Sequence, residues 1–331
     1  MIMGQAPASL RRLAGSISRR LGRAIGLLPP QPATGERRTH VYVMRLRDRR
    51  GVNGTIRQLS AGGRHWQSMI DAAGRAVVFW GSDEERPVHH LWLAPLNQAE
   101  PLCLTDGPNV NGQPYWCPNG RQIVFFSTAG ASETAEWTPS GQFDPDRPAA
   151  NLWLMDVETG KRRQLTEGPS VDERPAVSPD GREVVFVSNR SGAPNIWRVD
   201  LDGAGLHQVT AASALDYRPV FSPDGRCLAY FTIALDGSHR LAFLSWPEAE
   251  PIDRKLSHPF VWVHGPFWSA DGRTVLVHGM VRKNGRQGLW TIDIKNGTVR
   301  PMIVPGVADC SHGTWDSAER WITFDSHLSI A

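Results

Sequence analysis

Arg174-Pro-Ala-Val-Ser-Pro-Asp-Gly-Arg182 joins a short apolar stretch to a tight-turn pair, and it returns as Arg218-Pro-Val-Phe-Ser-Pro-Asp-Gly-Arg226. Weaker copies are Gln113-Pro-Tyr-Trp-Cys-Pro-Asn-Gly-Arg121, Gly265-Pro-Phe-Trp-Ser-Ala-Asp-Gly-Arg273, and the more divergent residues 67–75 and 312–320. Asp-Gly and Asn-Gly pairs supply the positive φ angles that a two-residue hairpin needs, and β-branched and aromatic residues flank them. Each copy is therefore predicted to form a β-hairpin.

The six copies recur at a nearly constant period. Their closing arginines stand at positions 75, 121, 182, 226, 273 and 320, so the steps are 46, 61, 44, 47 and 47 residues. This period is close to the roughly 40–45 residues of a four-stranded propeller blade. Two further strand-like segments follow each hairpin, for example Ile196-Trp-Arg198 and His207-Gln-Val-Thr210. The sequence thus predicts an all-β fold, a six-bladed β-propeller with four antiparallel strands in each blade.

The two ends of the repeat are incomplete in complementary ways. Residues 40–60 resemble the last two strands of a blade, and residues 313–324 resemble the first two. We expect these halves to pair and close the ring, which removes an exposed sheet edge. Residues 39–331 then form the propeller and residues 1–38 a separate tail. The long step comes from an insertion loop at 128–150, which is either functional or a plain surface excursion.

Composition sets limits on the class of protein. No apolar run is long enough for a transmembrane helix, and four cysteines without C-x-x-C spacing argue against a disulfide framework or a cysteine zinc site and fit a reducing compartment. Charge is uneven: residues 1–60 hold twelve arginines against two acidic residues, whereas the rest carries a formal charge of −7. Without an aromatic-rich basic face on the acidic body, nucleic-acid binding is not expected.

The repeated pattern R-P-x-x-S-P-D-G-R, followed by I-W-x-V-D and Q-L-T, resembles the TolB-like, or PD40, propeller repeat over residues 40–326. The resemblance implies the propeller fold. It does not define one function, because proteins with related propellers take part in translocation, precede the catalytic domains of serine peptidases, or are oligogalacturonate lyases. A G-x-S-x-G nucleophile motif is absent from the sequence, which argues against a peptidase.

The tail carries an amphipathic pattern. Apolar residues recur at helical spacing between residues 10 and 28, arginines occupy the rest of the helix, and Pro29-Pro30 ends the pattern. A basic helix of this kind docks on an anionic membrane surface or on a partner, although it is equally compatible with an incidental tail. We expect a cytoplasmic protein that is peripheral to a membrane if the tail docks there. Export through Ser18-Arg-Arg-Leu-Gly22, which resembles a twin-arginine signal, is the less favoured alternative.

Counting back from each closing arginine locates the residues that begin each first strand near the central mouth. The candidate ligand-binding residues from this count are Gln113, Asp172, Glu173, Arg174 and Asp216. Asp172 and Asp216 equally suit bracing of their own turns. Arg174 and Arg218 either grip a carboxylate or phosphate or pair with the acids Asp172, Glu173 and Asp216. Histidines enter from three neighbouring blades as His65, His264 and His312. They are candidate ligands for one divalent metal, Mn or Zn, or they cap the mouth through hydrogen bonds.

Seven of the thirteen tryptophans occupy two repeated core columns. Among the others, Trp66, Trp137 and Trp262 are placed to stack on a ligand such as a sugar ring.

Two functions remain open at this point. The first is a non-catalytic binding module that presents its mouth and one rim to a protein or an acidic glycan. The second is a metal-assisted lyase or related carbohydrate-active enzyme on an acidic, uronate-containing sugar, because Val263-His-Gly-Pro-Phe-Trp268 and Cys310-Ser-His-Gly313 are similar to segments of oligogalacturonate lyases.

That similarity implies that His264 is a metal ligand and His312 a ligand or catalytic base, whereas His65 and Arg218 follow from the geometry of the ring alone. Tyr217, beside Arg218, completes the candidate catalytic set with His312. The lyase family differs from this chain in having seven blades and a clustered His-Pro-His segment.

Overall fold

The computed structural model describes residues 39–326 apart from residues 61, 99, 130–147, 212–213, 235, 254–255, 257–259, 282–284, 286, 306 and 308–309. The expected amphipathic segment 10–28 lies outside the described residues, as does most of the insertion loop 128–150. In the part of the chain that is described, no helix is long and apolar enough to cross a membrane.

The described chain is built from short strands separated by tight turns. In chain order they are β1 (His40–Arg47), β2 (Arg50–Gly51), β3 (Arg57–Gln58), β4 (Arg64–Ile70), β5 (Ala76–Ser82), β6 (His90–Pro95), β7 (Leu102–Cys103), β8 (Asn111–Trp116), β9 (Gln122–Ser127), β10 (Asn151–Asp156), β11 (Arg162–Gln164), β12 (Asp172–Val177), β13 (Glu183–Ser188), β14 (Asn195–Asp200), β15 (His207–Gln208), β16 (Leu215–Phe221), β17 (Cys227–Ile233), β18 (His239–Ser245), β19 (Trp262–Trp268), β20 (Thr274–Met280), β21 (Gly288–Asp293), β22 (Val299–Pro301), β23 (Ser311–Trp315) and β24 (Trp321–Ser326).

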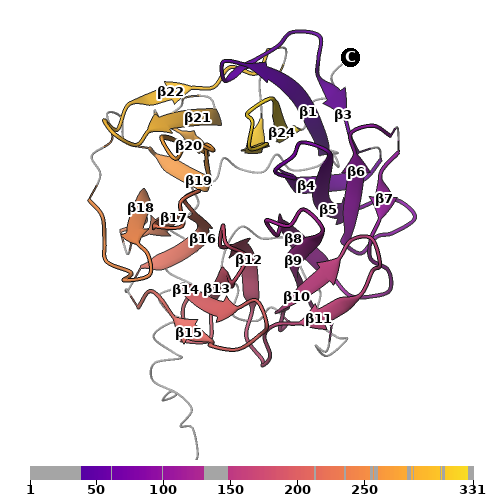
Figure 1. Cartoon of the computed structure of the whole chain (residues 1–331), viewed down its shortest axis with the longest axis vertical. Coiled ribbons are helices and arrows are strands. Elements are labelled where there is room, and N and C mark those ends of the chain that lie inside the picture. Colours follow the sequence, from indigo (N-terminus) through magenta and orange to yellow (C-terminus); the bar gives the residue numbers. More distant parts are fainter. Residues whose placement is uncertain are drawn as a thin grey trace, which may run out of the picture.

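The strands form six antiparallel sheets arranged in a ring (Figure 1). Blades 1 to 5 follow chain order as β4–β7, β8–β11, β12–β15, β16–β18 and β19–β22, and blade 6 contains β23, β24, β1, β2 and β3. The first strand of each blade lies innermost (Figure 1). The predicted six-bladed β-propeller is confirmed.

Blade 6 closes the ring as the sequence predicts. β1 pairs antiparallel with β24 from His40 opposite Ser326 to Arg45 opposite Trp321, and β3 pairs with β1. Arg49, in the turn after β1, forms ion pairs with Glu319 of blade 6 and Asp271 of blade 5. The beginning of the described chain is therefore fastened to its end by a strand ladder and by a charged side chain.

Blade 4 departs from the four-strand pattern. Among its described residues, the sheet has three strands, and the position of the fourth holds one isolated bridge between Leu244 and Pro251. Two prolines, Pro247 and Pro251, occur in this segment. Because proline has no N–H to donate, it shortens a ladder to the edge contact seen here.

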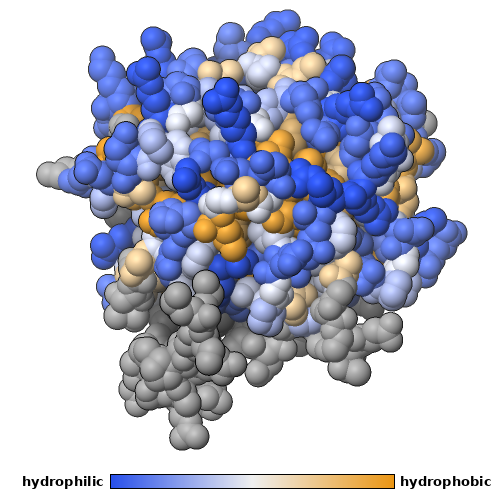
Figure 2. All heavy atoms as spheres, turned by 60° about the horizontal axis from the view of Figure 1, so that its bottom comes forward, coloured by the Kyte–Doolittle hydropathy of each residue, from blue (hydrophilic) through white to orange (hydrophobic). Residues whose placement is uncertain are grey.

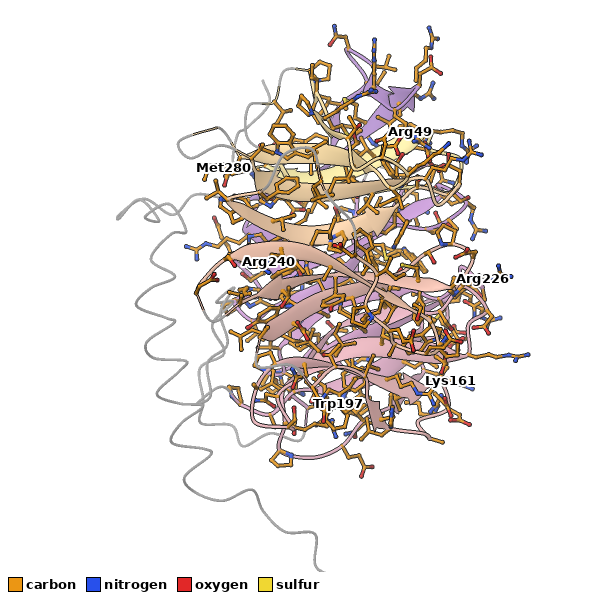
Figure 3. All side chains as sticks on the ribbon, turned by 90° about the vertical axis from the view of Figure 1, so that its left-hand side faces the viewer. Arg49, Lys161, Trp197, Arg226, Arg240 and Met280 are labelled. Atoms are coloured by element: carbon orange, nitrogen blue, oxygen red, sulfur yellow. The ribbon has the colours of Figure 1, made fainter. Side chains whose placement is uncertain are left out.

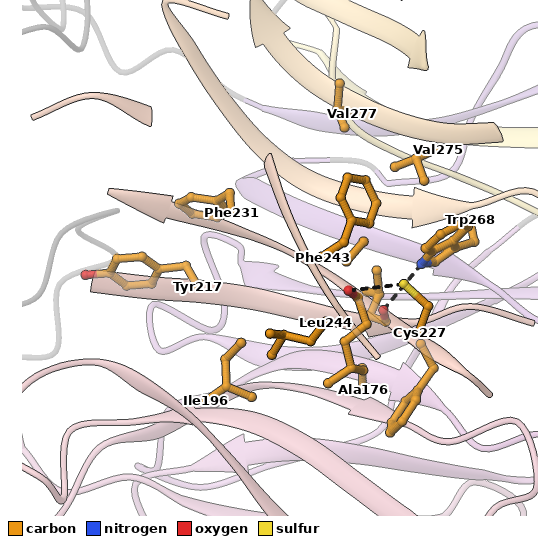
Figure 4. Packing of buried hydrophobic residues seen from close by; sticks show 14 of the residues in the cluster. Ala176, Ile196, Tyr217, Cys227, Phe231, Phe243, Leu244, Trp268, Val275 and Val277 are labelled. Atoms are coloured by element: carbon orange, nitrogen blue, oxygen red, sulfur yellow. Dashed lines mark hydrogen bonds between the residues drawn. The ribbon is translucent and has the colours of Figure 1, made fainter. Parts of the chain in front are cut away.

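Adjacent blades are held together by apolar packing and by repeated hydrogen bonds. A tryptophan near the end of a first strand donates its indole N–H to a first-strand carbonyl of the preceding blade. Trp116 Nε1 bonds Met69 O at 3.1 Å, and Trp315 Nε1 bonds Trp268 O at 2.7 Å. Figure 4 shows the same packing where Trp268 of blade 5 meets Phe243 of blade 4. Large apolar side chains are thereby removed from water, and the face seen in Figure 2 is mainly hydrophilic where it is coloured, with apolar patches between the polar side chains.

The connections divide between two faces of the ring, as expected for an antiparallel meander. Figure 3 shows Arg49, Lys161 and Arg226, which lie in or beside hairpin turns, on one face. Met280 and Arg240, at the end of a second strand and near the beginning of a third, lie on the other face. The first strands begin on this second face, which therefore carries the mouth of the ring.

Candidate functional site: an axial pocket lined by six bulge residues

A β-bulge occurs at the same position in the first strand of every blade. The pairing with the second strand shifts register there, for example between Glu173 and Ala176 in blade 3 and between Tyr217 and Val220 in blade 4. The first residue of each bulge has a positive φ. These six bulge residues are Gln67 (48°), Gln113 (53°), Arg174 (57°), Arg218 (51°), Gly265 (58°) and His312 (50°).

The bulge residues share an unusual backbone conformation and a common location. Non-glycine residues avoid positive φ, at a cost of roughly 1–3 kcal/mol each, and such strained positions concentrate at functional sites. Bulges re-aim side chains out of the regular pleat. Here all six bulge residues line one pocket on the axis of the ring, which has a cavity volume of about 90 Å³ and is partly open to solvent. We call it the axial pocket.

The axial pocket receives some of the predicted site residues and not others. Gln113, Arg174, Arg218 and His312 line it. The two residues that precede each bulge residue do not line this pocket. The predicted residues outside the pocket lining are His65, Trp66, Asp172, Glu173, Asp216, Tyr217, Trp262 and His264.

Arg218 extends toward the next blade. A Cβ added at Gly265 would lie 2.5 Å from Arg218 Nη1, so the guanidinium occupies the space that a side chain on blade 5 would need. Arg218 has no hydrogen bond or ion pair among the described residues. Burial, and next the charge of Arg174, lower the pKa of Arg218 to about 9, against smaller opposing effects of Asp325 and Glu173. Its charge is thus poorly compensated within the protein.

Arg174 differs from Arg218 because it has local partners. Its Nε lies 3.4 Å from Glu173 Oε1, and both side chains are nearly buried, at 11% and 9% exposure. Its guanidinium also lies over the ring of Tyr217, 5.6 Å from the centroid. Tyr217 is itself buried and stacked on Phe231 at 5.3 Å. This arrangement makes Tyr217 a support for Arg174, and the pairing predicted between Arg174 and Glu173 is present.

The two glutamines of the pocket use their oxygens within the protein. Trp80 Nε1 donates to Gln67 Oε1 at 3.2 Å, and the backbone N–H of Arg174 donates to Gln113 Oε1 at 2.7 Å. Indole and backbone N–H groups only donate, so the glutamine atom that faces each of them must be the oxygen. Both side-chain NH₂ groups lack a partner among the described residues.

Asp325 lies behind the axial pocket and contacts two of its lining residues, Gln67 and His312. This fully buried carboxylate of β24 accepts a hydrogen bond from the backbone N–H of Gln67 at 2.9 Å and lies 2.8 Å from His312 Nδ1. His312 is therefore oriented by an acid from the second strand of its own blade. Asp325 was not predicted from the sequence, because no repeated motif marks its position.

The three predicted metal-ligating histidines do not converge. His65 is buried inside blade 1, edge-on to Phe79 (5.3 Å) and Trp92 (5.5 Å), and burial lowers its pKa to about 4. His264 stacks on Phe231 at 4.7 Å, where burial, and next His278, hold its pKa well below the ordinary value. Within the described ranges, no three His, Cys, Asp or Glu side chains are grouped to hold a metal ion. This donor arrangement does not fit the Mn or Zn site expected from the sequence.

His278 also belongs to this group of histidines, although it was not predicted as a site residue. Its ring lies 4.8 Å from Trp262 and 5.6 Å from His312, and burial, then the charge of His312, lower its pKa. Neither of its ring nitrogens has a partner among the described residues. In the β19–β20 ladder His278 lies opposite His264, which was predicted as a site residue.

The predicted aspartates support the scaffold. Asp172 is fully buried and accepts hydrogen bonds from Ser188 Oγ at 2.6 Å and Arg190 Nη2 at 2.5 Å. Asp216 is buried beside Thr210 and Thr232, and burial raises its pKa. Both acids therefore brace their own blades, which was the alternative considered for them.

The predicted stacking tryptophans are engaged in packing. Trp262 is 5% exposed, between His264 and His278. Trp66 stacks on His89 at 5.3 Å and contacts Trp80 at 5.5 Å. Trp137 lies outside the described residues. Neither described ring forms a free platform in the axial pocket.

These features define the class of protein: a six-bladed propeller whose polar site lies on its axis. The family model described as TolB beta propeller domain (PD40) matches residues 145–315, and the chain belongs to this family. The resemblance proposed from the repeat is thereby confirmed.

Individual relatives are more distant. The chain is 28% identical over 135 residues to "Uncharacterized peptidase YuxL" of Bacillus subtilis (strain 168), covering 35% of this chain and about a fifth (20%) of that protein. TolB from Acinetobacter baumannii has a similar structure, with a TM-score of 0.56, 17% identity and coverage of 97% and 71% of the two chains. An oligogalacturonate lyase in complex with manganese is also similar, with a TM-score of 0.59, 18% identity and coverage of 84% of this chain and 78% of that chain. At these identities the structures establish the fold.

Proposed function

We propose that the protein is a binding module that takes a segment of a partner protein at the mouth of the axial pocket. The observation that carries this proposal is the convergence of six bulge positions, one from each blade, on a single pocket, with a non-glycine residue at positive φ in five of them. Strained residues that line the same pocket from five blades favour a role in recognition. Membership of the TolB propeller family supports the same function.

The alternative is a metal-assisted lyase on a uronate-containing sugar. It is supported by the structural likeness to the manganese-bound lyase and by His312, which lies in the axial pocket on Asp325. The donor arrangement weighs against it, because His65 and His264 are packed against Phe79 and Phe231 instead of meeting His312. We therefore derive no catalytic step.

Site-specific photo-crosslinking tests the binding proposal. A photoreactive amino acid is placed at Ser311, where β23 begins beside the mouth, and at the exposed Arg226 on the opposite face as the matched control. The two proteins are irradiated in cells of the source organism, and adducts are identified by mass spectrometry. We expect one dominant protein adduct from Ser311 that is absent from Arg226. The same adducts from both positions, or none from Ser311, would contradict a binding site at the mouth.

A further inference from the structure

The axial pocket offers hydrogen-bond donors and few free acceptors. Because the Gln67 and Gln113 oxygens already accept hydrogen bonds from Trp80 and Arg174, each glutamine presents its NH₂ group. Arg218 adds a guanidinium, which only donates. The acids near the pocket are engaged: Glu173 pairs with Arg174, and Asp325 contacts Gln67 and His312. A ligand that fits this pocket brings oxygen acceptors, and it brings negative charge for Arg218.

Gly265 creates the place for that charge. The other five blades carry Gln, Arg or His at the bulge position with φ between 48° and 57°, so the fold tolerates a side chain there. Blade 5 alone has glycine, and Arg218 fills the vacated space with Nη1 only 2.5 Å from where a Cβ would stand. The room left by Gly265 thus holds an arginine that has no anionic contact among the described residues.

The shape and chemistry favour a carboxylate over a larger anionic surface. Arg218 presents a planar fork that matches the two oxygens of a carboxylate. An opening on the ring axis, walled by first strands on every side, admits the end of a chain and excludes a folded surface. For a sugar we would expect an exposed aromatic face, but the described candidates Trp66 and Trp262 are packed against neighbouring rings. The C-terminal end of an extended peptide carries a carboxylate for Arg218, is narrow enough for the axial opening and needs no exposed aromatic face.

We infer that Arg218, with the free amide groups of Gln67 and Gln113, is the receptor for the C-terminal carboxylate of an extended peptide. This inference rests on the proposed binding function and names the chemistry that the axial pocket recognises. Capture of a terminal carboxylate by convergent donors is an established mode of peptide recognition. The rest of the peptide would run from the pocket toward the mouth, where the partner-specific contacts lie.

Ligand-observed NMR titration with N-acetyl-trialanine tests the inference, with its C-terminal amide as the neutral probe. The full-length protein is compared with Arg218→Met, with Gly265→Ala, which displaces Arg218 without removing it, and with Arg226→Met as the matched surface control. Because hydrogen bonds to charged groups contribute roughly ten- to a hundredfold in affinity, we expect at least about a tenfold loss in either pocket variant and with the amide. Arg226→Met should bind as the wild type does.

Several outcomes would overturn the inference. They are equal binding of acid and amide, no detectable binding of the acid, unchanged affinity in Arg218→Met, or binding of sodium galacturonate in preference to the peptide acid. Thermal melting of each variant shows whether it is folded, and Arg218→Lys, which keeps the charge but not the planar fork, should lose affinity partially. A crosslinked partner at Ser311 that is insensitive to Arg218→Met would leave the binding function standing and reject the carboxylate receptor.

Discussion

Acid should destabilise this propeller through a histidine that packs as if it were an apolar ring. His65 is 2% exposed and meets the faces or edges of Phe79 and Trp92 inside blade 1. Its pKa is lowered to about 4, mainly by burial, with smaller contributions from His40 and His89 and an opposing one from Asp83. The folded state thus holds His65 neutral over a pH range in which the same side chain takes up a proton in the unfolded chain.

The sign and size of the effect follow from this difference. Because the folded-state pKa lies below the ordinary 6.5, the stabilisation is fully present above pH 6.5 and is lost as the pH falls toward 4. A factor of ten in proton affinity corresponds to about 1.4 kcal/mol, so the full loss is about 3 kcal/mol and the loss by pH 4.5 about 2.5 kcal/mol. His65→Phe keeps an aromatic ring between the same neighbours and removes the titration.

Urea unfolding at pH 7.5, 5.5 and 4.5 measures this contribution. Between pH 7.5 and pH 4.5, we expect the free energy of unfolding to fall by about 2.5 kcal/mol more in the wild type than in His65→Phe. His207→Gln, at an exposed position, is the control and should follow the wild type. Parallel pH profiles for the wild type and His65→Phe would refute the argument that burial keeps His65 neutral.

Three further perturbations test the ring closure and the site. Arg49→Ala removes the ion pair with Glu319 and should lower the free energy of unfolding by about 1–2 kcal/mol in urea, more than Arg226→Ala does on the same face. Asp325→Ala leaves the Gln67 N–H without its acceptor and should lower the free energy of unfolding by about 2–3 kcal/mol. An unchanged melting temperature would show that this hydrogen bond is dispensable. By elemental mass spectrometry after incubation with Mn or Zn, His264→Ala/His312→Ala should contain as much metal as the wild type. One equivalent lost in the double variant would restore the lyase hypothesis.

The fold could be predicted because each blade repeats its turn chemistry. The Asp-Gly turn before Arg182 and its copies predict where the hairpins lie. Counting back from the closing arginine of each copy gives the positions of all six bulge residues. Counting did not show which of the neighbouring residues enter the axial pocket, because the bulge changes side-chain direction locally. His65, only two positions from Gln67, consequently lies inside a blade.

The remaining parts of the site depend on contacts between segments that the repeat does not relate. Arg218 reaches the space left by Gly265 of the next blade. Gly265 occupies the same repeat position as Arg218, but a glycine in the sequence gives no sign that a neighbouring side chain will fill its place. Asp325 belongs to a second strand and meets Gln67 across the ring closure. Such pairings arise from the three-dimensional packing of neighbouring blades, which periodicity does not encode.

The composite sixth blade also sets an order of events during synthesis. β1 is the first described strand to leave the ribosome and β24 the last, so the edge of β1 has no partner until nearly the whole propeller has been made. Contacts of such large sequence separation form slowly, and unpaired edges are prone to wrong association in the meantime. Blades 1 to 5 can form as the chain emerges. The ring, and with it the axial pocket, is completed only when β24 has been made, so ligand binding reports that synthesis has passed this strand.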